Sequence, residues 1–194
     1  MNDGELMAQV IARDPGAFEL LYNRYAGKAL AFTRRMIAEQ SVAEEIVQEA
    51  FWRVWRRSGS YNAERGNLAA WIMGIVHHLA IDELRRRRGQ APIAEDNLES
   101  NVIETVPTGD ADVLDQVDIG IRSAQMREAL ARLPEPQRSV IELSFYQGYT
   151  HEEIAAKLQQ PLGTIHTRAR LALNKLRTPS MHSDGAYQTQ LSAQ

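Results

Sequence analysis

The chain has 194 residues, which is enough for one or two domains with hydrophobic cores of their own. Hydrophobic residues make up 44% of the sequence, an ordinary share for a globular protein, and the absence of cysteine excludes disulfides and thiolate metal sites. The formal net charge of −3 argues against a uniformly basic nucleic-acid binder, but the charges are distributed unevenly along the chain.

No apolar run approaches the roughly 20 residues that span a bilayer. The first ten residues, MNDGELMAQV, also lack the basic and apolar segments of a signal peptide. We therefore expect a protein that works in the cytoplasm.

The sequence from residue 5 to residue 39 predicts two helices. Leu6, Val10 and Ile11 share one face of the first, and Asp14-Pro15-Gly16 ends it. The second carries apolar residues at helical spacing, namely Ala17, Phe18, Leu21, Tyr22, Tyr25, Leu30, Phe32, Met36 and Ile37. Core packing explains most of these positions.

Ser41 to Glu44 has the pattern of a capping box, followed by a helix to Arg57. Its apolar stripe is Ala43, Ile46, Val47, Ala50, Phe51, Val54 and Trp55. The other face holds Trp52 among charged residues. An exposed Trp there favours a protein partner, because Trp and Arg are frequent at interface hot spots. The alternative is that Trp52 folds down onto the core.

A loop of turn-forming residues from Ser58 to Asn67 precedes a helix from Leu68 to the arginine run 85–88. The expected buried stripe of this helix is Leu68, Trp71, Ile72, Ile75, Leu79 and Leu84. The arginines either complement the helix dipole or contact a phosphate backbone. Likewise, Trp71 with Tyr61 either stacks on an unpaired base or packs in the core.

Residues 90–121 predict an acidic linker. Between Gly89 and Ile121 there are eight Asp or Glu residues and no Lys or Arg, and two prolines interrupt the weak periodicity. After residue 177 the chain is polar, so we expect a disordered tail from 178 to 194.

The segment from Leu133 to Leu176 predicts a helix-turn-helix. A capping box beginning at Thr150 opens one helix, and Gln159-Gln160-Pro161 separates it from a second, with Pro161 expected in its first turn. From residue 122 to residue 177, nine basic and five acidic residues give a local balance of +4. In the second helix, an apolar arc of Ile165, Ala169, Ala172, Leu173 and Leu176 leaves His166, Thr167, Arg170 and Asn174 facing outward. Such a helix is typical of entry into a DNA major groove. An ordinary helical hairpin with a solvated basic face is the alternative.

Two other classes of protein, an enzyme and a transcriptional activator or repressor, fit the sequence less well. An enzyme is disfavoured, because His77-His78 and His151-Glu152-Glu153 lack metal-ligand spacing and no phosphate loop or nucleophile–base pair is present. A helix-turn-helix activator or repressor would need a sensor domain. Residues 1–89 show no ligand-pocket or receiver pattern that would supply one.

The sequence resembles the extracytoplasmic-function (ECF, group 4) sigma factors of the sigma-70 family. The resemblance covers about residues 5 to 177 and depends on the order of several segments. These are AFELLYNRY (17–25), AEEIVQEAFWRVW (43–55), YNAERGN (61–67) running into LAAWIMGIVHHLAIDELRRRR (68–88), and ALARLPEPQRSVIELSFYQGYTHEEIAAKLQQPLGTIHTRARLALNKLR (129–177).

The resemblance implies an all-α protein of two helical domains joined by an acidic, flexible linker. Residues 1–89 would form the sigma-two domain, 90–121 the linker, 122–177 the sigma-four helix-turn-helix domain and 178–194 a disordered tail. The protein would bind core RNA polymerase, recognise the −35 and −10 promoter elements, promote DNA melting and initiate transcription of a stress or envelope regulon. It implies no catalysis and no cofactor.

The resemblance also assigns candidate contacts. For the −10 element, where a base would be flipped into a pocket of the loop, they are Tyr61, Asn62, Asn67, Trp71, His77, His78, Asp82, Arg85 and Arg86. For the β′ clamp helices of core polymerase they are Glu45, Gln48, Glu49, Trp52 and Arg53. The sigma-four domain would touch the β flap, and its −35 candidates are Thr164, His166, Thr167, Arg168, Arg170 and Asn174.

The sequence departs from the family pattern at several positions. His77-His78 stands where an Arg-Asn pair is usual, and His166 stands where Lys or Arg is common. Leu171 and Leu173 also replace a common Arg, and only Leu173 falls on the apolar arc. We therefore expect fewer phosphate contacts from the last helix. The family further implies an anti-sigma factor that covers the polymerase-binding surfaces.

Overall fold

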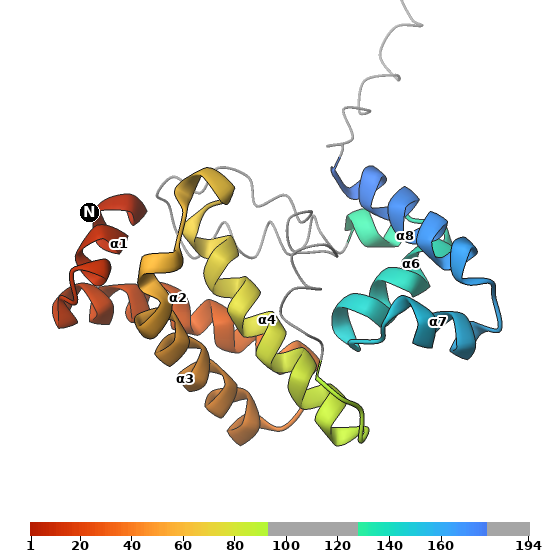
Figure 1. The fold of residues 1–194 in the computed structure, drawn as a ribbon, viewed down its shortest axis with the longest axis horizontal. Helices are drawn as coiled ribbons and strands as arrows, with labels where there is room; N and C mark the ends of the chain where they lie inside the picture. Colours follow the sequence, from red (N-terminus) through yellow and green to blue (C-terminus); the bar gives the residue numbers. More distant parts are fainter. Residues whose placement is uncertain (93–127, 178–194) are drawn as a thin grey trace, which may run out of the picture.

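The computed structural model describes residues 1–92 and 128–177. The described residues form helices and connecting turns, without strands, as predicted. The helices gather into an N-terminal module (residues 1–92) and a C-terminal module (residues 128–177), drawn on opposite sides of Figure 1. Residues 93–121 of the linker predicted at 90–121, residues 122–127 of the predicted second domain and the predicted tail lie outside the described residues.

The N-terminal module contains four α-helices, α1 (Asp3–Ile11), α2 (Pro15–Met36), α3 (Gln40–Arg57) and α4 (Leu68–Arg87). Local sequence explains where the first two begin. Asn2 and Glu5 form a capping box on α1, and the Asp14 side chain accepts from Ala17 N at the start of α2, where Pro15 occupies the first turn. The predicted break between these helices is therefore confirmed.

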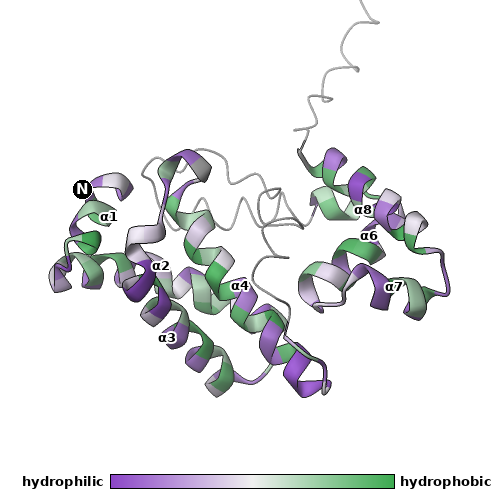
Figure 2. Cartoon of the chain, in the orientation of Figure 1, coloured by the Kyte–Doolittle hydropathy of each residue, from purple (hydrophilic) through white to green (hydrophobic). Residues whose placement is uncertain are grey.

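The core of this module lies where all four helices meet. Phe51 and Val54 of α3 are buried against α1, α2 and α4, and the Phe18 ring packs on the rings of Phe51 and Trp55. Figure 2 shows the apolar residues along these helices and the hydrophilic C-terminal end of α4. Burial of this apolar surface fixes the position of α4 and of the loop before it.

The capping box predicted at Ser41 is wrong. Helix α3 begins at Gln40, with Glu39 as N-cap and no side-chain cap hydrogen bond. Ser41 therefore already lies inside the helix. The Gln40 side chain donates instead to Glu44 at 2.8 Å, so the residue expected to close the box pairs one turn back along the helix surface.

The buried stripe of α4 also differs from the expectation. Leu68 and Ile72 are fully buried as predicted, but the stripe continues through Val76, Ala80 and Ile81. The predicted members Trp71, Ile75, Leu79 and Leu84 are half-buried. Val76 belongs to the core of the N-terminal module, whereas Ile81 lies against Gly148 of the C-terminal module.

The C-terminal module contains α6 (Glu135–Ile141), a π-helical segment η5 (Glu142–Tyr146), α7 (His151–Leu158) and α8 (Leu162–Arg177). The Thr150–Glu153 capping box is confirmed, with both reciprocal hydrogen bonds present. Gln159 ends α7 in the left-handed conformation. Pro161 lies immediately before α8 rather than within its first turn, and its carbonyl accepts from Thr164 N and Ile165 N.

The apolar arc of α8 packs as predicted. Ile165, Ala169 and Ala172 are buried, and Leu173 and Leu176 pack beside them. Leu171 lies outside the arc and is 40% exposed. The helix-turn-helix thus has a buried seam and an outward polar face.

Candidate nucleic-acid interface

The loop between α3 and α4 folds as two 3-10 turns, η1 (Ser58–Ser60) and η2 (Ala63–Arg65). Two asparagines organise it. The Asn62 side chain accepts from Glu64 N at 2.9 Å, and that of Asn67 accepts from Ala70 N at 2.8 Å and caps α4. Both oxygens satisfy backbone donors, which fixes the loop where it enters α4.

Tyr61 and Trp71 form an aromatic pair beside this loop. Their ring centroids are 5.5 Å apart at an interplanar angle of 54°, and both side chains are half-buried against the core. The pair therefore belongs partly to the core while keeping some ring surface in solvent. Rings held in this way offer a stacking surface for an unpaired base.

Farther along α4, polar side chains pair within the helix. His78 lies 3.2 Å from Asp82, and Arg86 and Arg87 both donate to Glu83. Burial alone would raise the pKa of Glu83, but hydrogen bonds from the two arginines outweigh it and hold that pKa below its usual value. The Arg86 side chain is nevertheless 74% exposed, so it is accessible to a phosphate.

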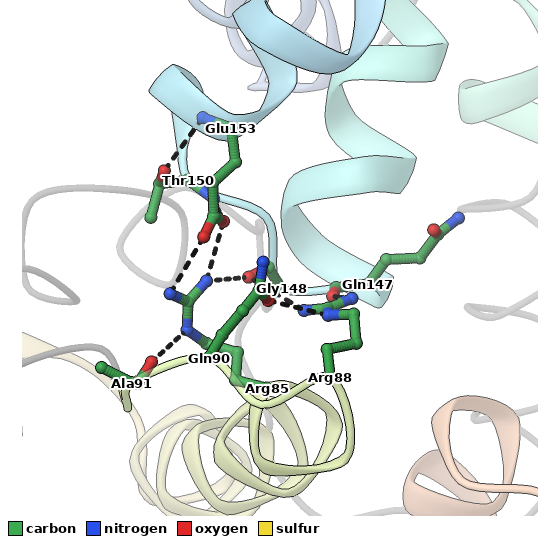
Figure 3. A network of polar contacts seen from close by, with 8 residues as sticks. All are labelled: Arg85, Arg88, Gln90, Ala91, Gln147, Gly148, Thr150 and Glu153. Carbon is green, nitrogen blue, oxygen red and sulfur yellow. Dashed lines mark hydrogen bonds and ion pairs between the residues drawn. The ribbon is translucent and has the colours of Figure 1, made fainter.

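His77 and Arg85 lie on the side of α4 that faces the C-terminal module. They are only 5% and 6% exposed, because both face the C-terminal module. The Arg85 guanidinium donates to Glu153 at 2.8 Å and 3.1 Å and to the Gly148 carbonyl at 2.9 Å (Figure 3). The His77 ring stacks on that of Phe145 at 4.3 Å and 18°. Two of the candidate −10 residues are therefore covered in this arrangement.

The α8 candidates share the outward face of the helix-turn-helix. His166, Thr167, Arg170 and Asn174 are exposed, and Thr164 and Arg168 are half-buried, with the Thr167 hydroxyl donating to the Gly163 carbonyl. Among the described residues, neither Arg168 nor Arg170 has an ion-pair partner. The structure thus groups the −35 candidates on one face with two unpaired guanidinium groups.

His166 also contacts the preceding helix. Its ring lies 4.9 Å from that of His151, the first residue of α7. The pKa of His151 is lowered, chiefly by burial and further by His166, although Glu152 opposes this. The lowered pKa favours the neutral form of His151, which therefore adds little positive charge beside this face.

The candidate polymerase contacts lie together on α3. Glu45, Gln48 and Glu49 are exposed, Trp52 is 55% exposed, and Arg53 donates to Glu49 at 2.8 Å. Trp52 therefore does not fold onto the core, which removes the alternative that the sequence left open. A large exposed aromatic ring beside charges has the character of a protein-binding surface.

Sequence reasoning missed the residues that cover α4. Glu153 was assigned only to a capping box, and Phe145, Gln147 and Gly148 received no role. Each contacts α4 at a separation of 59 to 68 residues. The one local feature that could have pointed to this contact was the glycine of the Gln147-Gly148 turn, because glycine permits a close approach of the backbone.

The described residues contain no group of three His, Asp or Glu side chains that could hold a metal ion. None of the helices in that part of the chain is both long and apolar enough to cross a membrane.

Comparison with known proteins identifies the two modules. Residues 21–90 match Sigma-70 region 2, and residues 129–178 match Sigma-70, region 4. The ECF RNA polymerase sigma factor RpoE of Cereibacter sphaeroides is 36% identical over 165 residues, which cover 85% of this chain and 87% of that protein. The ECF RNA polymerase sigma factor SigK of Mycobacterium ulcerans is 29% identical over 178 residues, with 89% and 90% coverage.

A solved structure also matches. The crystal structure of Rhodobacter sphaeroides SigE in complex with the anti-sigma ChrR is 34% identical, covers 89% of this chain and 94% of that chain, and superposes with a TM-score of 0.44. The family predicted from the sequence is confirmed by the two regions and by the similarity to RpoE. The chain belongs to the ECF sigma factors of the sigma-70 family, which are transcription initiation factors.

Proposed function

We propose that this chain binds core RNA polymerase in the cytoplasm, recognises a −35 and a −10 promoter element, and promotes local melting of the DNA. The observation that carries the proposal is the presence of Sigma-70 regions 2 and 4, in that order, in a chain similar to RpoE over most of its length. The regulon would be a stress or envelope response.

In this proposal, strand opening belongs to the loop and the first turns of α4. A base leaving the duplex would stack against the Tyr61–Trp71 pair while Asn62 and Asn67 hold the loop in shape. Unstacking a base costs a few kcal/mol, and contacts in the pocket offset this cost. Melting thereby depends on sequence and needs no ATP hydrolysis. His77, His78, Asp82, Arg85 and Arg86 would contact neighbouring bases and phosphates.

The −35 element would be read by α8. Its outward face enters the major groove, with Arg168 and Arg170 contacting phosphates and Thr164, His166, Thr167 and Asn174 near base edges. Among the described side chains of this face, two arginines lack an ion-pair partner, so the contact is electrostatically modest. Polymerase would therefore supply much of the total affinity, through the exposed face of α3 on the β′ clamp helices and through the C-terminal module on the β flap.

An anti-sigma factor would hold the protein inactive by covering these polymerase-binding surfaces. This part of the proposal derives from family membership. Because the chain has no cysteine, any thiol-based sensing would have to lie in that partner. Copurification of a co-encoded partner that blocks binding of core polymerase tests it.

Promoter selection followed by run-off transcription tests the proposed function. Core polymerase reconstituted with this chain as the only sigma factor selects fragments from a random DNA library, and the enriched fragments serve as templates. We expect enrichment of two elements at fixed spacing and transcripts starting downstream. A Trp52→Ala variant should lose core binding, while Glu19→Ala, an exposed residue away from the candidate surfaces, should not. Absence of transcripts across the library would refute the proposal.

A further inference from the structure

The contact between α4 and the C-terminal module is closely fitted. At Gly148 the backbone has φ +67°, and a Cβ atom built there would lie 2.8 Å from Cγ2 of Ile81 and 3.0 Å from its Cδ1. A side chain at this position would push the two modules apart. Gly148 therefore meets both a conformational and a packing requirement of the contact.

Polar groups surround this close approach. Arg85 makes a bidentate ion pair with Glu153. Bidentate arginine–carboxylate pairs are among the most directional ion pairs in proteins. Arg88 donates to the Gln147 carbonyl at 2.5 Å (Figure 3). Its guanidinium also lies 4.2 Å from the centre of the Tyr149 ring. Two arginines of the run thus bind the turn between η5 and α7.

An aromatic contact closes the other side. The His77 Nε2–H donates to the Phe145 carbonyl at 2.8 Å, the His77 ring stacks on that of Phe145, and Phe32 of α2 packs edge-on against Phe145 at 6.1 Å. Each partner on the C-terminal side comes from residues 145–153. This short stretch therefore contacts α4 at His77, Ile81, Arg85 and Arg88.

The covered residues include two that the proposed function needs. Arg85 is 6% exposed and its guanidinium already binds a carboxylate, so it cannot also bind a phosphate. The stacked, buried imidazole of His77 likewise cannot contact a base. Binding the −10 element through Arg85 or His77 thus requires the C-terminal module to leave α4.

We propose that residues 145–153 form an autoinhibitory clasp on α4, which keeps the −10 surface closed until polymerase or promoter DNA draws the two modules apart. The clasp rests on the proposed function only in what it inhibits, since the contact itself can be measured without any DNA. It would give the free protein lower affinity for a −10 strand than the opened one. If the clasp is closed in about nine molecules of ten, apparent affinity falls about tenfold.

Two variants open the clasp from the side that the proposed function does not use. Glu153→Gln removes the charge that pairs with Arg85, and glutamine still completes a capping box with Thr150. Gly148→Ala introduces the clash with Ile81. Circular dichroism checks that each variant keeps its helices. If Gly148→Ala does not fold, Glu153→Gln alone tests the clasp.

Each variant has a matched control. Glu128→Gln removes the same charge from an exposed pair with Arg132 that does not join the modules. Gly89→Ala places the same side chain at φ +68°, where nothing lies within 4 Å. Glu128→Gln thus reproduces the loss of charge, and Gly89→Ala reproduces the backbone strain, while neither changes a residue of the clasp.

The test measures the distance between the modules in the full chain by pulsed electron spin resonance. Because the chain has no cysteine, spin labels attach only at introduced Glu19→Cys and Lys175→Cys, both exposed. The clasp predicts a short, narrow distance population in the parent protein, reduced at least threefold by Glu153→Gln and by Gly148→Ala but not by the controls. The same two variants should bind the single-stranded −10 oligonucleotide of the selected promoter at least threefold more tightly.

The clasp is refuted if the parent shows no short-distance population, if Glu153→Gln leaves that population unchanged, or if the opened variants bind the oligonucleotide no better. These results differ from failure of the proposed function. A chain that supports no transcription but shows the short distance would refute the sigma activity, whereas an active chain without that distance would refute the clasp.

Discussion

His77 is buried in a way that suits only its neutral form. Its Nε2–H donates to the Phe145 carbonyl, and among the described residues its Nδ1 atom is buried without a hydrogen-bond partner. Protonation would place a second N–H where nothing accepts it. Burial lowers the pKa of His77, and neighbouring His78 lowers it further, while the hydrogen bond to Phe145 opposes the shift.

This environment predicts a clasp that weakens in acid. In the open form His77 would titrate near the ordinary pKa of about 6.5, and in the closed form below it. The closed form therefore binds fewer protons, so its stability is full above about pH 6.5 and falls as the pH drops further. The short-distance population should therefore stay constant above about pH 6.5 and shrink as the pH is lowered from there to about 5.5.

The surroundings of His77 and a control variant isolate this effect. The groups facing it are the Phe145 carbonyl, the rings of Phe145 and Phe32, and the imidazole of His78. His77→Gln can keep a donor toward Phe145 but cannot be protonated. The pH dependence should flatten in that variant, and an unchanged profile would assign it to another group.

Arg170 is predicted to contact a phosphate of the −35 element. It is exposed on α8 and lacks an ion-pair partner among the described residues. Arg170→Ala should weaken holoenzyme binding to promoter DNA and reduce the salt slope of the binding constant by about 1. Arg132→Ala, which removes an exposed arginine of the same module outside α8, is the control. An unchanged slope for Arg170→Ala would contradict the assignment.

For single residues, the sequence predicts which side of a helix is apolar, but not which polar residues become buried by a distant part of the chain. Exposure of Leu171 and burial of Ile165 and Ala172 follow from the helical period, and both are found. Burial of Arg85 could not be predicted, because a charged residue is buried only when a partner is present. Its partner Glu153 lies 68 residues away.

Among the elements, α3 and α7 show that a capping-box sequence forms the capping hydrogen bonds at one helix start and not at another. Both have a Ser or Thr followed three residues later by Glu, but only Thr150 has the extended backbone of an N-cap. The start of α3 is set instead at Gln40, one turn before the apolar stripe requires it. A capping box therefore depends on where the preceding connection ends, which local sequence does not determine.

The two patterns give a paired prediction. Thr150→Ala should destabilise the start of α7 by about 1 kcal/mol, because a backbone N–H loses its acceptor. Ser41→Ala should change local stability by no more than a few tenths of a kcal/mol, because Ser41 caps nothing and alanine favours helix. Hydrogen exchange of the first-turn amides of α7 and α3 measures both. Equal effects at the two sites would contradict the difference in capping.

At the scale of the whole molecule, the sequence predicted the two helical modules but not the contact between them. The two helical modules follow from apolar periodicity and from the order of family segments. The clasp depends on contacts between residues about sixty positions apart, and neither module alone has a pattern that reveals them. The arginine run was interpreted as a dipole complement or a phosphate contact, and the structure adds that two of its members bind the other module.

The central claim is that this chain directs promoter opening by core polymerase. Permanganate reactivity of unpaired thymines tests it most directly, on the selected promoter with core polymerase, this chain and no other sigma factor. We predict reactive thymines at the −10 element without ATP, fewer of them with Trp71→Ala, and recovery of that variant's transcription on a pre-melted template. A −10 element that stays unreactive with the parent protein bound to polymerase would contradict the account.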